Sequence, residues 1–126
     1  MRDTELAGLA RTLSQDHGIT ITVSGEHSYC STDAARINIA RMPPTALGRQ
    51  LMCGLVYHEV GHQNYTTGNR PVGLLGELTN VIEDIRIERL TLNQRPGSRY
   101  DLEAVTNYYT EKNHLSLRIS RRRFWD

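Results

Sequence analysis

The sequence predicts an α+β fold, in which a small antiparallel sheet packs on one long helix that further helices follow. Three observations predict this class. Two short segments alternate apolar and polar residues, as half-buried strands do. Several longer segments repeat apolar residues three and four positions apart, which is typical of amphipathic helices. The chain has 126 residues, which is the length of a single domain.

The N-terminal third is predicted to form one helix and two strands. Leucines at helical spacing indicate a helix from Asp3 to His17, which Gly18 can end. The alternating segments Ile19–Val23 and Ala35–Ala40 are expected to pair as antiparallel strands, and the polar segment Ser24–Asp33 to form a loop between them. Ala35–Ala40 has the pattern of an edge strand that can hold an extended peptide, and equally that of an ordinary edge strand.

The remaining chain is predicted to be helical. Thr45 is a favourable N-cap for the first of these helices, in which Leu47, Leu51 and Leu55 form a stripe that should face the core. We expect helices at 45–65, 74–93 and 101–112, a loop at 66–71, and an interruption between the last two helices at 95–97.

Composition and charge argue against several functional classes. The net charge of +1 argues against a nucleic-acid-binding protein, and no apolar run approaches the length of a membrane span. We expect one domain over residues 1–114 and a basic tail or linker stub over 115–126, where four arginines precede Phe124 and Trp125. Two cysteines do not make a disulfide framework, and no apolar signal region begins the chain, so a cytoplasmic location is expected.

The most specific feature is the sequence His58-Glu59-Val60-Gly61-His62, an H-E-x-x-H pattern inside a predicted helix. Residues four apart lie on the same helix face, so His58 and His62 can bind one metal ion, while Glu59 can face a water molecule beside it. The two histidines continue the buried leucine stripe, where a shared metal removes the cost of burying polar groups. Gly61 is expected where another backbone or a ligand approaches closely.

A hydrolytic zinc site normally has three protein ligands. The downstream candidates are Glu77, Glu83, Asp84, Glu88 and His114. Glu83 is the preferred third ligand because it lies on a mixed face with Asn80, Ile87 and Leu90. Asp84 is the main rival, either as a ligand or as a partner that orients a ligand histidine. Glu77 and Glu88 are expected to be exposed to solvent.

These motifs carry a resemblance to known proteins. The H-E-x-x-H helix, followed by Asn80-Val81-Ile82-Glu83-Asp84, resembles the gluzincin branch of zinc metallopeptidases, in which a glutamate ligand lies on a later helix. The region from Tyr57 to Leu102 is also similar to the metallopeptidase-like region of cobaltochelatase T-subunit-type proteins and their phage-encoded relatives. In those longer proteins a von Willebrand A-type domain follows. The resemblance therefore implies either a partner protein or a further C-terminal domain, with the basic tail as a linker stub, or a stand-alone version of the region.

The resemblance implies a zincin-like fold, in which Zn²⁺ is held by His58, His62 and Glu83. It also implies a metallopeptidase that hydrolyses peptide or protein substrates with Glu59 as general base. The alternative is a zinc-stabilised binding or adaptor module of a larger assembly, which has no need of Glu59. A third alternative is nucleic-acid binding through the arginine-rich tail. The candidates to stabilise an oxyanion are Tyr65, Arg86, Tyr100, Tyr108, Tyr109 and His114, and no spacing distinguishes among them.

Overall fold

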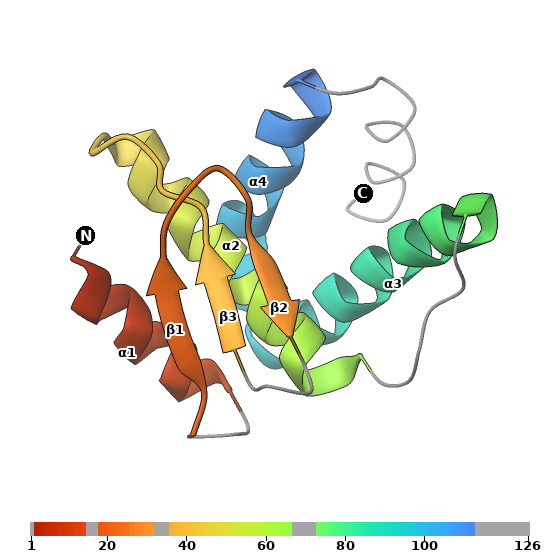
Figure 1. Cartoon of the computed structure of the whole chain (residues 1–126), viewed down its shortest axis with the longest axis horizontal. Coiled ribbons are helices and arrows are strands. Elements are labelled where there is room, and N and C mark those ends of the chain that lie inside the picture. Colours follow the sequence, from red (N-terminus) through yellow and green to blue (C-terminus); the bar gives the residue numbers. More distant parts are fainter. Residues whose placement is uncertain (1, 15–17, 32–35, 67–72, 113–126) are drawn as a thin grey trace.

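A computed structural model describes residues 2–14, 18–31, 36–66 and 73–112 (Figure 1). The elements are, in chain order, α1 (Asp3–Leu13), β1 (Thr20–Val23), β2 (Tyr29–Ser31), β3 (Arg36–Ile39), α2 (Ala46–Tyr65), α3 (Gly73–Gln94), the 3-10 turn η1 (Pro96–Ser98) and α4 (Arg99–Lys112). The predicted α+β class is therefore confirmed, and the described residues form a mixed sheet of three strands rather than the expected pair.

The strand pairing differs from the prediction in direction and order. The sheet order is β1-β3-β2, with β1 parallel to β3 and β2 antiparallel to β3. The expected antiparallel pairing of Ile19–Val23 with Ala35–Ala40 is wrong because the segment between them, expected to be a loop, contains β2. A chain that reverses twice brings its third strand back in the direction of the first. The expectation that Ala35–Ala40 is an edge strand is also wrong, since β3 lies between β1 and β2.

A buried asparagine organises the connection between β1 and β2. Asn38 is 3% exposed, and its amide nitrogen donates to the carbonyl oxygens of Ser24 (3.0 Å) and His27 (2.8 Å). Its side-chain oxygen accepts from the hydroxyls of Thr22 and Ser24 at 2.7 Å and 2.9 Å. These bonds use both donors and the acceptor of the amide, so they fix residues 24–28 against the sheet.

Helix α2 is the centre of the molecule, because it contacts α1, α3, α4, β2 and β3. Thr45 is its N-cap, as predicted, and the Thr45 hydroxyl accepts from the Gly48 amide at 3.0 Å. Leu51 and Leu55 are buried as expected, whereas Leu47 is 54% exposed, so the buried stripe begins one turn later than predicted. Tyr108 and Tyr109 of α4 are partly buried and pack against this core.

Glycines in α2 allow two neighbouring helices to approach closely. A Cβ atom at Gly54 would lie 2.3 Å from the carbonyl oxygen of Asp101 in α4. A Cβ atom at Gly61 would lie 2.9 Å from Ile87 Cδ1 and 3.0 Å from Thr91 Oγ1 in α3. The close approach at Gly61 is therefore made by side chains of α3, not by the backbone or ligand that the sequence led us to expect. It brings the face of α3 that carries Ile87 against the part of α2 that carries the motif.

The boundaries of the other helices agree with the predictions to within a few residues. Helix α1 ends at Leu13 because Ser14 is extended, with φ −75° and ψ 143°, and residues 15–17 lie outside the described residues. The tail at 115–126 also lies outside them, and so does His114. Within the described part of the chain, no helix is both long and apolar enough to span a membrane.

The first half of α3 carries an apolar stripe that is largely exposed. Leu75, Leu78 and Ile82 are 62%, 54% and 66% exposed, and Leu74 beside them is 72% exposed. In Figure 1 this half of α3 extends away from the sheet and from α1, whereas its C-terminal half lies against α2. Contiguous apolar surface of this kind is typical of sites that contact another molecule.

Candidate metal centre

The two histidines of the motif lie together on the face of α2 that meets α3. Their ring centroids are 4.8 Å apart, and the ring planes are nearly perpendicular at 81°. His62 is buried at 7% exposure, and the side chain of His58 is 14% exposed. The spacing of four residues in a helix therefore brings both imidazoles to one place, as predicted from the sequence.

Helix α3 supplies a carboxylate to the same place. Asp84 Oδ1 lies 2.9 Å from His62 Nε2 and 3.6 Å from His58 Nε2. His58, His62 and Asp84 form a group whose candidate ligand atoms all lie within 4.8 Å of one another. Ligand atoms about 2.0–2.1 Å from a tetrahedral zinc ion are about 3.4 Å apart. The distance from Asp84 Oδ1 to His58 Nε2 is close to that value. The distance from Asp84 Oδ1 to His62 Nε2 is shorter by about half an ångström.

Each imidazole is also held at its other nitrogen. His58 Nδ1 lies 3.0 Å from Glu88 Oε1, and Glu88 is 3% exposed. His62 Nδ1 lies 2.9 Å from the hydroxyl of Thr66, at the C-cap of α2. Metal-binding histidines are typically oriented in this way, with the nitrogen that does not bind the metal donating to a carboxylate or another oxygen. Both rings are thereby turned so that their Nε2 atoms face Asp84.

The site favours a positive charge among its carboxylates. A neutral imidazole has one N–H donor and one acceptor, yet His58 has a carboxylate near each nitrogen: Glu88 at Nδ1 and Asp84 at Nε2. Burial by itself lowers the pKa of His58. The hydrogen bond to Glu88 and the charges of Glu88, Asp84 and Glu59 outweigh burial and raise the pKa to about 9. A proton supplies this charge in the metal-free protein, and a divalent cation can supply it instead.

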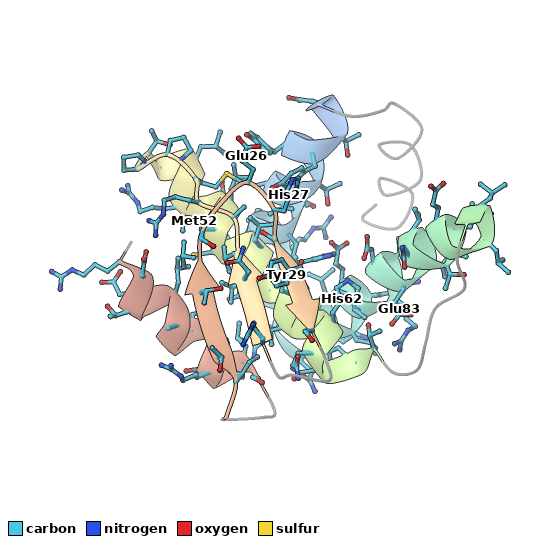
Figure 2. All side chains as sticks on the ribbon, in the orientation of Figure 1. Glu26, His27, Tyr29, Met52, His62 and Glu83 are labelled. Carbon is cyan, nitrogen blue, oxygen red and sulfur yellow. The ribbon has the colours of Figure 1, made fainter. Side chains whose placement is uncertain are left out.

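Glu83, the preferred third ligand from the sequence, is not in the group formed with Asp84. Its Oε1 accepts a hydrogen bond from the Thr66 hydroxyl at 2.8 Å, and its carboxylate also pairs with Arg86. Figure 2 shows Glu83 close to His62, where α3 passes the C-terminal end of α2. The geometry therefore favours Asp84 as the third ligand, which was the rival interpretation of the sequence, and gives Glu83 a supporting position.

Glu59 lies beside the histidines and lines a pocket. Glu59 follows His58 directly in α2 and is only 6% exposed. The pocket has a volume of about 230 Å³ and lies between α2, α4 and the segment before β2. It is lined by Glu26, His27, Ser28, Leu55, His58, Glu59, Val105 and Tyr109. In Figure 2, Glu26 and His27 lie on that segment, which connects β1 to β2.

Among the described residues, most candidates for oxyanion stabilisation do not line this pocket. Tyr65 donates to Gln94 at 2.6 Å, Arg86 pairs with Glu83, and Tyr100 is 72% exposed. Tyr109 is the candidate that lines the pocket, together with His27, which the sequence did not single out for this role.

Two side chains of the site were not predicted. Glu88 was expected to be exposed, and this expectation is wrong, whereas Glu77 is exposed as expected. Glu88 follows Asp84 by four positions, so a helix that presents Asp84 to the histidines presents Glu88 as well. Thr66 follows His62 by four positions in the same way. The helical spacing in the sequence therefore carried a signal for both residues.

Comparison of the chain with protein-family models, curated proteins and solved structures found no match.

Proposed function

We propose that this protein is a zinc-dependent metallopeptidase of zincin-like fold, which hydrolyses a peptide bond of a peptide or protein substrate. The observation that carries the proposal is the convergence of His58, His62 and Asp84, with Glu59 buried beside them at the wall of a pocket. Two imidazoles, one carboxylate and an adjacent general base match the requirements of metal-assisted hydrolysis.

The donor set fits a zinc ion, which we assign to His58 Nε2, His62 Nε2 and Asp84 Oδ1. Three protein ligands leave a position for a fourth, as catalytic zinc sites require. When bound, zinc would polarise a carbonyl oxygen and lower the pKa of a water molecule to about 7. The buried Glu88 and the half-buried Thr66 support the assignment, because they turn both Nε2 atoms towards Asp84.

In this proposal Glu59 is the general base. Its carboxylate takes the proton of the attacking water and delivers it to the nitrogen of the leaving amine. The adjoining pocket, walled by Leu55, Val105 and the ring of Tyr109, would take a side chain of the substrate. Strand β2 lies at an edge of the sheet, directly after the pocket residues, so an extended substrate could pair with it.

Substitution Glu59→Gln tests the enzymatic role. The amide keeps the shape of the side chain and cannot accept a proton, so we expect zinc to be retained and cleavage to fall by at least about a hundredfold. The measurement combines zinc content with cleavage of a mixed library of unstructured peptides, read by mass spectrometry. Glu5→Gln on α1 is a matched control that should cleave as the wild type does. Equal cleavage by wild type and Glu59→Gln would refute the general-base role.

A second candidate function is a zinc-stabilised binding module that acts as a subunit or adaptor. The exposed stripe of Leu74, Leu75, Leu78 and Ile82 favours it, because such a surface is suited to a partner protein. This function requires the metal ligands and has no requirement for Glu59. A wild-type protein that binds zinc and cleaves nothing in the peptide library would favour the module over the peptidase.

A further inference from the structure

A chain of hydrogen bonds leads away from the candidate metal centre at the end of α2. His62 Nδ1 lies 2.9 Å from Thr66 Oγ1, and Thr66 Oγ1 donates to Glu83 Oε1 at 2.8 Å. The guanidinium of Arg86 donates to both oxygens of the Glu83 carboxylate and to the backbone carbonyl of Tyr65. The chain therefore joins the last turn of α2 to α3 through side chains that bind no metal in the proposed site.

The direction of these bonds follows from the chemistry of each group. An ionised carboxylate accepts hydrogen bonds and donates none, and a hydroxyl has a single proton. Because the Thr66 hydroxyl gives its proton to Glu83, it can only accept from His62. The Nδ1 atom of His62 must then carry the hydrogen, which leaves the lone pair of neutral His62 on Nε2, the atom that faces Asp84.

We propose that Thr66 is a positioning residue, which Glu83 holds in the orientation that makes His62 Nε2 available to a metal ion. The proposal rests on the metal site of the proposed function and assigns no catalytic step to either residue. It also gives Glu83 and Asp84, adjacent on α3, different tasks: Asp84 binds the metal, and Glu83 sets the donor direction of the hydroxyl that orients His62.

Arg86 secures this arrangement from two sides. Its ion pair with Glu83 keeps that carboxylate in place, and its bond to the Tyr65 carbonyl satisfies an acceptor near the end of α2. The backbone amide of Thr66 donates to the His62 carbonyl at 2.9 Å, which fixes the main chain of the threonine as well. Thr66 is thus held by its backbone and by its hydroxyl, as a group that orients a ligand must be.

The test compares the zinc affinity of four variants with that of the wild-type chain by competition with a chromophoric chelator. Thr66→Val removes the hydroxyl and keeps the branched shape, so we expect a loss of zinc affinity of about 10- to 100-fold. Thr66→Ser restores the hydroxyl and should bind within about threefold of wild type, a rescue that a role in packing alone would not give. Thr12→Val is the matched control. The Thr12 hydroxyl donates to the Gly8 carbonyl at an exposed position of α1, so this variant should bind zinc as the wild type does.

Glu83→Ala keeps the proposal falsifiable if Thr66→Val does not fold. It frees the Thr66 hydroxyl to donate to His62, so we expect weaker binding than wild type at an unchanged stoichiometry of one zinc. Complete loss of stoichiometric zinc in Glu83→Ala would make Glu83 a ligand and overturn the proposal. Wild-type affinity in Thr66→Val would overturn it too. A wild-type chain that binds no zinc refutes the proposed function instead, which distinguishes the two failures.

Discussion

Gly54 is a position where one added methyl group should disturb the packing of two helices. In Gly54→Ala the new Cβ would lie 2.3 Å from the Asp101 carbonyl oxygen and 2.5 Å from Val105 Cγ2, whereas ordinary contacts begin at 3.4 Å. The Asp101 carbonyl oxygen is part of the backbone of α4, so it cannot rotate away as the end of a side chain can. Helix α4 must therefore move by about 1 Å relative to α2, a rearrangement typical of overpacked cores.

The expected magnitude combines two opposing effects. Overpacking of this severity costs about 3 kcal/mol, at the upper end of the usual range. Alanine is better than glycine inside a helix by about 1 kcal/mol, which offsets part of that cost. The net destabilisation is about 2 kcal/mol, and it should lower the Tm by about 6–10 °C in a domain of this size. Val105 lines the pocket beside Glu59, so movement of α4 should also weaken any peptide cleavage.

Thermal and urea unfolding, followed by circular dichroism, measure this effect. Gly8→Ala on α1 is the matched control, because nothing lies within 4 Å of a Cβ added at that exposed position. The control should be stabilised by about 0.5–1 kcal/mol through helix propensity alone. The two substitutions are thus expected to have opposite signs. A Gly54→Ala variant as stable as Gly8→Ala would refute the close packing of α2 on α4.

Three further predictions follow from pKa shifts. The pKa of His58 is raised from 6.5 to about 9, so a proton competes with zinc, and zinc affinity should rise by up to about tenfold from pH 7 to pH 8 in a chelator titration. A pH-independent affinity would contradict this. In the metal-free protein the same shift contributes stability that is fully present below pH 6.5 and lost as the pH rises through about 9, which urea unfolding in EDTA can follow. Burial, and secondarily the charge of Asp101, raise the pKa of the Cys53 thiol above 9.0. In a Cys30→Ser background, iodoacetamide should therefore alkylate folded protein at pH 8 several times more slowly than urea-unfolded protein, and equal rates would count against it.

Some features of the molecule were accessible from residue spacing alone. The four-residue step between His58 and His62 predicts that they share a helix face, and Thr45 has the side chain that an N-cap requires. Both are local properties of one helix. The parallel pairing of β1 with β3 was not accessible, because it depends on β2, whose three residues are too short to show an alternating pattern.

The choice between Glu83 and Asp84 as third ligand shows a different limit of prediction from sequence. Adjacent residues in a helix point in directions about 100° apart, so the rotation of α3 about its axis decides which carboxylate faces the histidines. That rotation is set by the contact of Ile87 and Thr91 with Gly61 of α2. The face turned to α2 is therefore Asp84, Ile87, Glu88 and Thr91, rather than the predicted face of Asn80, Glu83, Ile87 and Leu90. Sequence spacing defines both faces equally well, and only packing between the helices selects one.

Zinc content by elemental analysis tests the central claim most directly, with wild type, Asp84→Ala and Glu83→Ala purified in parallel and their folding checked by circular dichroism. We expect one zinc per chain in wild type, loss of zinc in Asp84→Ala, and one zinc retained in Glu83→Ala at saturating metal. A wild-type chain that is fully folded and binds no zinc would contradict the account, as would zinc retained in Asp84→Ala and lost in Glu83→Ala.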